Sequence, residues 1–424
     1  MEETTLSNGM RLIFEPMDQV KSVSIGIWLL SGSRFETPEE AGIGHLIEHL
    51  MFKGTETMSA REIAEAIDSL GGHVNAFTTK EYTCYYAKTL PEFVEPALRL
   101  IADMLLHPKF DPEECERERM VVMEEIRLYE DTPDDVVHDI LAKAAWGNHP
   151  LGRPVLGTYD TVSEIDRDRI RSFYERYYVP ERALVSGAGC FEVKRLVRIF
   201  EELFSGWSAS SAAAPVDRKK GKKTGERLKA STHVRPQRER ITRQKNTEQV
   251  HFCLGAEGVA LGDEDVYTFQ ILNEILGGGG SSRLFQRVRE ERGLAYSIYS
   301  YLSSYTDAGL FTIYAGVNPS SFREVLDIIA NEMRALNEEG ITEKELANAK
   351  TLLKSDLLLG LEATSARMSR LGKSGLLLGR VPGIDEVISK IDAVTLDDVN
   401  QVTRRVMIPD ELTMSVVGPV KDLD

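Results

Sequence analysis

The chain has 424 residues, too many for one typical domain, so two or three domains are expected. Hydrophobic residues make up 42% and charged residues 28%, as in a globular protein, and no apolar run approaches the roughly 18 residues of a membrane span. The net charge of −16 argues against nucleic acid as a partner and suits basic or unfolded peptides, although solubility alone would explain it equally well.

The N-terminus begins Met1-Glu2-Glu3 and shows no charged-then-apolar leader. A cytoplasmic location is the simplest expectation, but a mature chain whose leader has been removed fits the same sequence. The four cysteines are far apart and form no C-x-x-C, so we expect buried free thiols and no cysteine metal site.

Strand-like runs at 11–15 and 22–30 precede a helical stretch that carries the motif H-x-x-E-H, formed by His45, Glu48 and His49. Positions i and i+4 share one face of a helix, so both imidazoles can converge on one metal ion. Glu48 lies on nearly the same face, within reach of a water on that metal. The pattern predicts a hydrolytic zinc site. The alternative is a helix that carries two histidines by chance, in a chain with only 8 histidines.

A capping box opens the next helix, 59–70, and the Gly-Gly that follows ends it. Residues 73–79 and 81–88 are predicted to form paired strands. A helix at 91–105 comes after them.

The helix predicted at 111–130 offers a third ligand. Glu118 and Glu125 are two turns apart and share a face, with Val121-Val122 between them on the same side. Carboxylates beside an apolar stripe face inward and need a partner, whereas Glu124 points about 100° away and is expected in solvent. Ordinary exposed charge is the alternative for both glutamates, but the neighbouring H-x-x-E-H helix favours a metal site.

Helices are also predicted at 134–146 and 164–178. From 211 to 236 the sequence loses its apolar periodicity and becomes basic, which is typical of an exposed linker. A nucleic-acid or membrane patch is the alternative, but the segment lacks interleaved aromatic residues and amphipathic spacing. The role of the basic run at 218–245 stays open.

The second half of the chain repeats a pattern of the first. The segment 86–93 matches 314–322, and an amphipathic helix follows each. We predict an α+β fold of two homologous domains, each a mostly antiparallel sheet packed with helices, at 1–210 and 237–424. The second domain has one histidine, His251, so it is expected to bind no metal.

The H-x-x-E-H motif followed by a glutamate 76 residues after His49 resembles the pitrilysin family of zinc metallopeptidases. The resemblance implies that His45, His49 and Glu125 bind Zn²⁺. It also implies that Glu48 is the general base and that Glu118 is an acid of the second shell around the metal.

The segment 116–119 with Glu125 is most similar to the catalytic subunit of mitochondrial processing peptidase and its bacterial homologues. In that family two related domains form one half of a clamshell. The resemblance further implies that Asn75, Ala76 and Phe77 belong to an edge strand that pairs with the substrate. A routine hairpin strand is the alternative.

A glycine-rich loop at 276–285 does not match a phosphate-binding motif. It is followed by Arg289 and Tyr296, a pair at the spacing that the family uses to reach the substrate at the zinc. An ordinary helix-end arginine and a packed tyrosine are the alternative. The resemblance suggests a homodimer in which this pair acts on the partner's zinc, and a heterodimer with a related chain is the second possibility.

The sequence thus predicts a zinc endopeptidase that hydrolyses peptides or unfolded segments bound as an added strand. The alternatives are a non-catalytic scaffold or partner subunit of a processing-peptidase-like complex, and a zinc-dependent assembly protein without turnover. The ligand types do not distinguish Zn²⁺ from Co²⁺ or Mn²⁺.

Overall fold

The computed structural model describes residues 1–208 and 234–420. Their contacts divide into two compact units, each built on one β-sheet. Unit 1 contains residues 1–127, 153–208 and 360–381, and unit 2 contains residues 128–152, 234–359 and 382–420. The predicted linker at 211–236 lies outside the described residues except for 234–236, and so does the basic run as far as residue 233.

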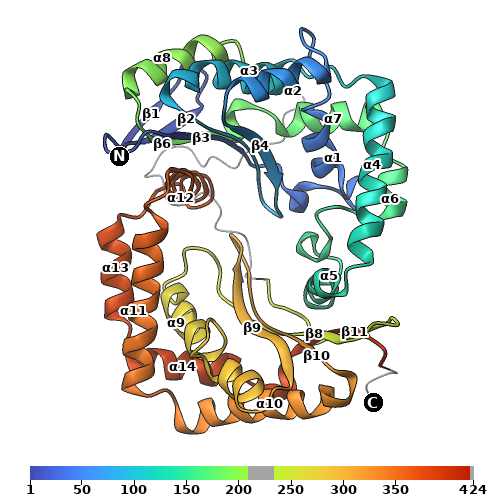
Figure 1. The fold of residues 1–424 in the computed structure, drawn as a ribbon, viewed down its shortest axis with the longest axis vertical. Helices are drawn as coiled ribbons and strands as arrows, with labels where there is room; N and C mark the ends of the chain where they lie inside the picture. The colour runs from blue at the N-terminus through green and yellow to red at the C-terminus, as the bar shows by residue number, and fades with distance from the viewer. Residues whose placement is uncertain (209–233, 421–424) are drawn as a thin grey trace. The chain divides into compact units, whose positions relative to one another are not determined.

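The sheet of unit 1 has six strands in the order β1-β2-β6-β3-β5-β4 (Figure 1). Neighbouring strands are antiparallel except β2 and β6, which are parallel. The strands are Glu2–Thr5 (β1), Arg11–Pro16 (β2), Val23–Leu29 (β3), His73–Thr78 (β4), Thr83–Thr89 (β5) and Ala183–Gly189 (β6). At the end of this order, β4 pairs with β5 alone among the described strands.

The two faces of this sheet are covered by different helices. Alternate residues of β3, from Val23 to Leu29, enter the main core, as the two-residue period of a strand requires. The residues between them, Ser24 and Trp28, face α12 on the other side. The helices of unit 1 are Ile43–Leu50 (α1), Ala60–Ser69 (α2), Val94–Leu106 (α3), Pro112–Glu130 (α4, whose last residues belong to unit 2), Tyr159–Ser163 (α6), Arg167–Tyr177 (α7), Val193–Phe204 (α8) and Thr364–Leu377 (α12).

Helix α12 comes from the C-terminal half of the sequence but packs on the sheet of unit 1, against β6, β3 and β2 (Figure 1). Trp28 Nε1 donates a hydrogen bond to Ser186 Oγ at 2.8 Å, and Ser186 Oγ donates to the Met368 carbonyl at 2.8 Å. A Cβ at Gly372 would lie 2.0 Å from the Trp28 ring, so only glycine permits this approach.

The sheet of unit 2 repeats this topology. Its order is β7-β11-β8-β10-β9, and its one parallel pair, β7 and β11, corresponds to β2 and β6. The strands are Arg240–Gln244 (β7), Val250–Glu257 (β8), Ala295–Ser304 (β9), Gly309–Val317 (β10) and Thr413–Gly418 (β11). The helices are Pro133–Trp146 (α5), Val266–Leu276 (α9), Phe322–Glu339 (α10), Glu343–Gly360 (α11), Ile384–Ala393 (α13) and Leu396–Val406 (α14). The predicted pair of related α+β domains with mostly antiparallel sheets is confirmed at the level of topology.

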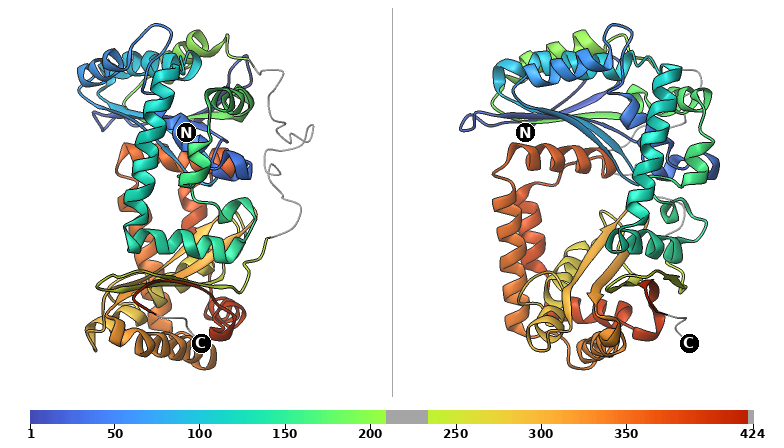
Figure 2. Two further views of the ribbon diagram at one scale, coloured as in Figure 1. Left: turned by 90° about the vertical axis from the view of Figure 1, so that its right-hand side faces the viewer. Right: turned by 45° about the vertical axis from the view of Figure 1, so that its right-hand side comes forward.

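Helix α5 makes the reciprocal exchange. It comes from the N-terminal half of the sequence but packs on β11 and β8 of unit 2 (Figure 2). Val137 and Leu141 share a core with Cys253 and Leu310, and Ser415 Oγ donates to the Val137 carbonyl at 2.8 Å. The compact units therefore differ from the predicted domains by one helix in each direction, because each sheet is covered by a helix from the other half of the sequence.

The predicted elements agree with the observed ones to within a few residues. The capping box at Ser59 and Glu62 is present at the start of α2. The four cysteines are free, and all except the half-buried Cys190 are buried. No helix among residues 1–208 and 234–420 is both long and apolar enough to cross a bilayer.

Candidate metal centre

The helix that carries H-x-x-E-H is fixed at its N-terminus by a carboxylate. Gly42 caps α1 with φ of 96°, and Glu36 accepts hydrogen bonds from Gly42 N and Gly44 N, both at 2.9 Å. A carboxyl group at this end of a helix satisfies N–H groups that have no partner within the helix. Burial raises the pKa of Glu36 to about 8, although the two backbone hydrogen bonds act in the other direction.

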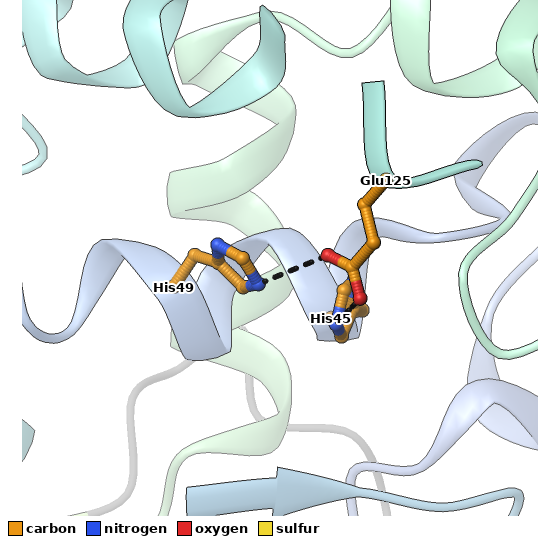
Figure 3. Close-up of side chains that lie close together, drawn as sticks. All are labelled: His45, His49 and Glu125. Carbon is orange, nitrogen blue, oxygen red and sulfur yellow. Dashed lines mark ion pairs between the residues drawn. The ribbon is translucent and has the colours of Figure 1, made fainter. Parts of the chain in front are cut away.

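His45 and His49 lie one turn apart on α1, and both point toward Glu125 of α4 (Figure 3). His45 Nε2 is 3.9 Å from Glu125 Oε1, and His49 Nε2 is 3.5 Å from Glu125 Oε2. Burial, helped by the neighbouring His49, lowers the pKa of His45 to about 4. The His45 imidazole is therefore neutral near pH 7, the state in which it can bind a metal.

Helix α4 turns its two predicted glutamates toward α1, but the apolar stripe between them is incomplete. Val122 is buried, whereas Val121 is 46% exposed, so the prediction that both valines face inward is wrong for Val121. One helical step separates the two residues by about 100°, which is enough to move Val121 to the open side. Glu124 is exposed as predicted and pairs with Arg127.

Glu118 is buried and lies behind His49 as seen from Glu125. Its Oε2 is 3.3 Å from His49 Nδ1, and its Oε1 is 2.9 Å from Lys53 Nζ. A carboxylate on the far nitrogen of a metal-binding imidazole fixes the tautomer and the orientation of the ring. His45 Nδ1 is buried with no hydrogen-bond partner among the described residues, so packing orients that ring.

Glu48 is held by a residue of the neighbouring strand. Thr78 Oγ1 donates a hydrogen bond of 2.5 Å to Glu48 Oε2. Burial raises the pKa of Glu48 above its usual range, and the hydrogen bond from Thr78 opposes this effect.

Lys53 and Thr78 were not predicted from the sequence. Lys53 follows His49 by four residues, and Thr78 follows Ala76 by two, so helical and strand periodicity could have pointed to both.

The donor set of the three side chains fits a zinc ion. Two imidazole nitrogens and a carboxylate oxygen lie within 4.8 Å of one another, and no other such group of His, Cys, Asp or Glu occurs among residues 1–208 and 234–420. Ligands about 2.0–2.1 Å from a tetrahedral zinc are about 3.3 Å apart. The separations of 3.5 and 3.9 Å from Glu125 are close to this value, and no two of the three ligand atoms are more than 4.8 Å apart.

Strand β4 presents an edge near this centre, since β4 packs against α1. Asn75 is exposed, and its Oδ1 accepts a hydrogen bond from Ala76 N at 2.8 Å. The side chain of Ala76 is buried in the core, and Phe77 packs edge-on against Trp28 at 5.9 Å between ring centroids. The backbone, more than these side chains, is therefore what β4 can offer to a peptide.

Arg289 and Tyr296 belong to unit 2, whereas the three candidate ligands belong to unit 1. Arg289 lies in the short π-helix Phe285–Glu290 (η6), and Tyr296 lies on β9, the edge strand that corresponds to β4. The guanidinium carbon of Arg289 is 5.6 Å from the centroid of the Tyr296 ring, and Tyr296 is 78% exposed.

Two family models match consecutive parts of the chain. Residues 11–159, which include the metal centre, match the model described as insulinase (peptidase family M16), and residues 164–353 match the peptidase M16 inactive domain. Unlike the first match, the second contains none of the three candidate ligands.

Similar full-length chains and structures are known. The chain is 46% identical to the uncharacterized zinc protease YmxG of Bacillus subtilis, over 98% of this chain and 97% of that protein. It is 44% identical to the uncharacterized zinc protease SCO5738 of Streptomyces coelicolor, over 100% of this chain and 90% of that protein. A protease from Helicobacter pylori has the same fold, with a TM-score of 0.87 at 23% identity over 99% of both chains.

Proposed function

We propose that the chain, which belongs to the M16 (insulinase) family of peptidases, is a zinc endopeptidase acting on unstructured peptides. The observation that carries the proposal is the convergence of His45, His49 and Glu125 beside Glu48. Two imidazole nitrogens and one carboxylate leave an open coordination position, which a catalytic zinc requires and a structural zinc lacks.

Each side chain has one role in this proposal. His45, His49 and Glu125 would hold the ion, which supplies the Lewis acidity that activates a water and polarises a carbonyl. Glu48 would accept a proton from the attacking water at Oε1, because its Oε2 is engaged by Thr78, and would deliver that proton to the leaving amine. Glu118 would orient His49.

The peptide would bind as an added strand along β4. An edge strand offers backbone donors and acceptors that recognise any extended chain, which explains tolerance of sequence. Asn75, Ala76 and Phe77 would line the peptide through their backbone, and the Asn75 side chain would release Ala76 N as the peptide pairs.

The assembly would be a homodimer in which Arg289 and Tyr296 hydrogen-bond the substrate or the oxyanion at the partner's zinc. The support is the exposure of Tyr296 and its pairing with Arg289. A heterodimer with a related chain is the second possibility. Light scattering during gel filtration of the purified chain distinguishes the two, and a monomer with full activity would contradict both.

The test of the function is cleavage of an unstructured peptide by the purified chain. We expect activity that is lost with a chelator, restored by Zn²⁺, and reduced at least about 1,000-fold by Glu48→Gln. Glu56→Gln is the control, since Glu56 is an exposed glutamate beyond the same helix. Cleavage that survives the chelator would refute the mechanism, and zinc binding without cleavage of any peptide would favour a scaffold.

A further inference from the structure

We infer that Thr78 is a positioning residue that ties the end of the substrate strand to the general base. This inference rests on the proposed function, because it assigns Thr78 a part in the same reaction. Thr78 is the last residue of β4, and its hydroxyl lies 2.5 Å from Glu48 Oε2. This hydrogen bond therefore connects the strand that would bind the peptide with the residue that would transfer the proton.

The hydroxyl group of Thr78 has a single proton, and in this contact Thr78 Oγ1 donates it to Glu48 Oε2. Thr83 Oγ1, 3.3 Å from Thr78 Oγ1, can then donate to Thr78 in turn. The chain from Thr83 through Thr78 to Glu48 holds Oε2 and leaves Oε1 for the water.

The two branches of the Thr78 side chain face different neighbours. In β4 the side chains of Val74 and Ala76 point into the core of unit 1, and Thr78 continues on their side, the side of α1. Gly44, the residue before His45, faces the methyl group of Thr78. One branch of the side chain therefore faces the metal helix, while the other bonds to Glu48.

The free edge of β4 ends at this residue. The next two carbonyls, of Thr79 and Lys80, already accept hydrogen bonds from Ser33 N at 3.0 Å and Arg34 N at 2.8 Å. A peptide that pairs with β4 would therefore reach its last free position at Thr78. Any shift of β4 on peptide binding would move the Thr78 hydroxyl, and with it the Glu48 carboxylate.

The kinetic test compares two substitutions of Thr78. Thr78→Val keeps both branches and removes the hydroxyl, so we expect kcat on an unstructured peptide to fall about 10- to 100-fold, because a small misplacement of a reacting group costs up to about 100-fold. KM should stay within about threefold, and bound zinc should stay unchanged. Thr78→Ser keeps the hydroxyl and should retain kcat within about threefold. Thr89→Val removes a buried hydroxyl at the other end of the same hairpin and should change neither constant.

Crystal structures of the metal-free wild type and of Thr78→Val give a readout that needs no activity. We expect the Glu48 carboxylate to leave its wild-type rotamer in Thr78→Val and to keep it in Thr78→Ser. If the wild type cleaved no peptide, the proposed function would be refuted. The comparison of the Glu48 rotamer in the crystal structures would still test whether Thr78 positions Glu48. An unmoved Glu48, an unchanged kcat in Thr78→Val, or an equal loss in Thr78→Ser would overturn the inference.

Discussion

At the scale of single residues, the centre contains two glutamates of α4 in opposite environments. Glu125, the candidate ligand, is half-exposed, whereas Glu118 is buried. A buried carboxylate is costly unless it is paired, and Glu118 has two partners, His49 and Lys53. Lys53 is thus the only full positive charge that contacts Glu118 among the described residues, and it indirectly supports the ring of His49.

We predict that Lys53→Met weakens zinc binding. Without the ammonium group, Glu118 holds His49 less firmly, and removal of such outer partners costs about 10- to 100-fold in metal affinity. Competition with a fluorescent chelator measures the change in Kd. The matched control is Lys109→Met, which breaks an exposed pair with Asp111 and should leave Kd unchanged. Equal affinity of the wild type and Lys53→Met would contradict the assigned role.

The residues that sequence could predict are those set by local periodicity. Helical spacing placed His45 with His49 and Glu118 with Glu125, and the structure brings all four together. Periodicity could place Thr78 and Lys53 near the site but could not identify their partners, because Thr78 of β4 contacts Glu48 of α1 and Lys53, in the bend after α1, contacts Glu118 of α4. Those contacts depend on packing that no single segment encodes.

At the scale of elements, α5 meets the second sheet through a polar cluster as well as an apolar one. His138 Nδ1 lies 2.7 Å from Tyr301 OH and 3.4 Å from Cys253 Sγ, and its ring is tilted over Tyr314. Burial lowers the pKa of His138, while Asp134, Asp135 and Asp139 act in the opposite direction. The predicted second domain contains one histidine, His251. Helix α5 brings a second histidine, His138, to the same face of the sheet.

We predict that acidification loosens α5. Because the folded pKa of His138 is below the unfolded value of about 6.5, the native state binds fewer protons, and stability falls as the pH drops below that value. Hydrogen exchange of α5 amides, corrected for intrinsic rates, should show lower protection at pH 5.5 than at pH 7.5.

His138→Gln should remove most of that pH dependence. Helix α7, which contains no histidine, serves as the internal control. Identical pH dependence of α5 in the wild type and His138→Gln would show that another group is responsible.

At the scale of the whole molecule, the duplication was visible in the sequence but the helix exchange was not. The match of 86–93 with 314–322 corresponds to β5 and β10, each followed by a short 3₁₀ turn and a long helix. A linear division at the linker assigns α5 and α12 by position in the chain. The structure assigns them by which sheet face they cover.

We predict that zinc stabilises the chain against heat. An ion that binds only the native state at about 100 times its Kd adds about 2.7 kcal/mol. For a body of about 200 residues this raises Tm by roughly 5–10 °C. Differential scanning calorimetry with and without a chelator measures the shift. Glu125→Gln should abolish the shift, whereas Glu124→Gln, one position away and facing solvent, should preserve it. A shift that persists in Glu125→Gln would place the ion elsewhere.

The close approach of Gly372 to Trp28 has a consequence for how this chain can change over time. The first half of the sequence lacks the helix that closes its own sheet, and the second half lacks α5 in the same way. Deletion, duplication or transfer of one half of the gene alone would expose an apolar sheet face to water. The two halves of the sequence share a sheet topology, but the exchanged helices make each half depend on the other.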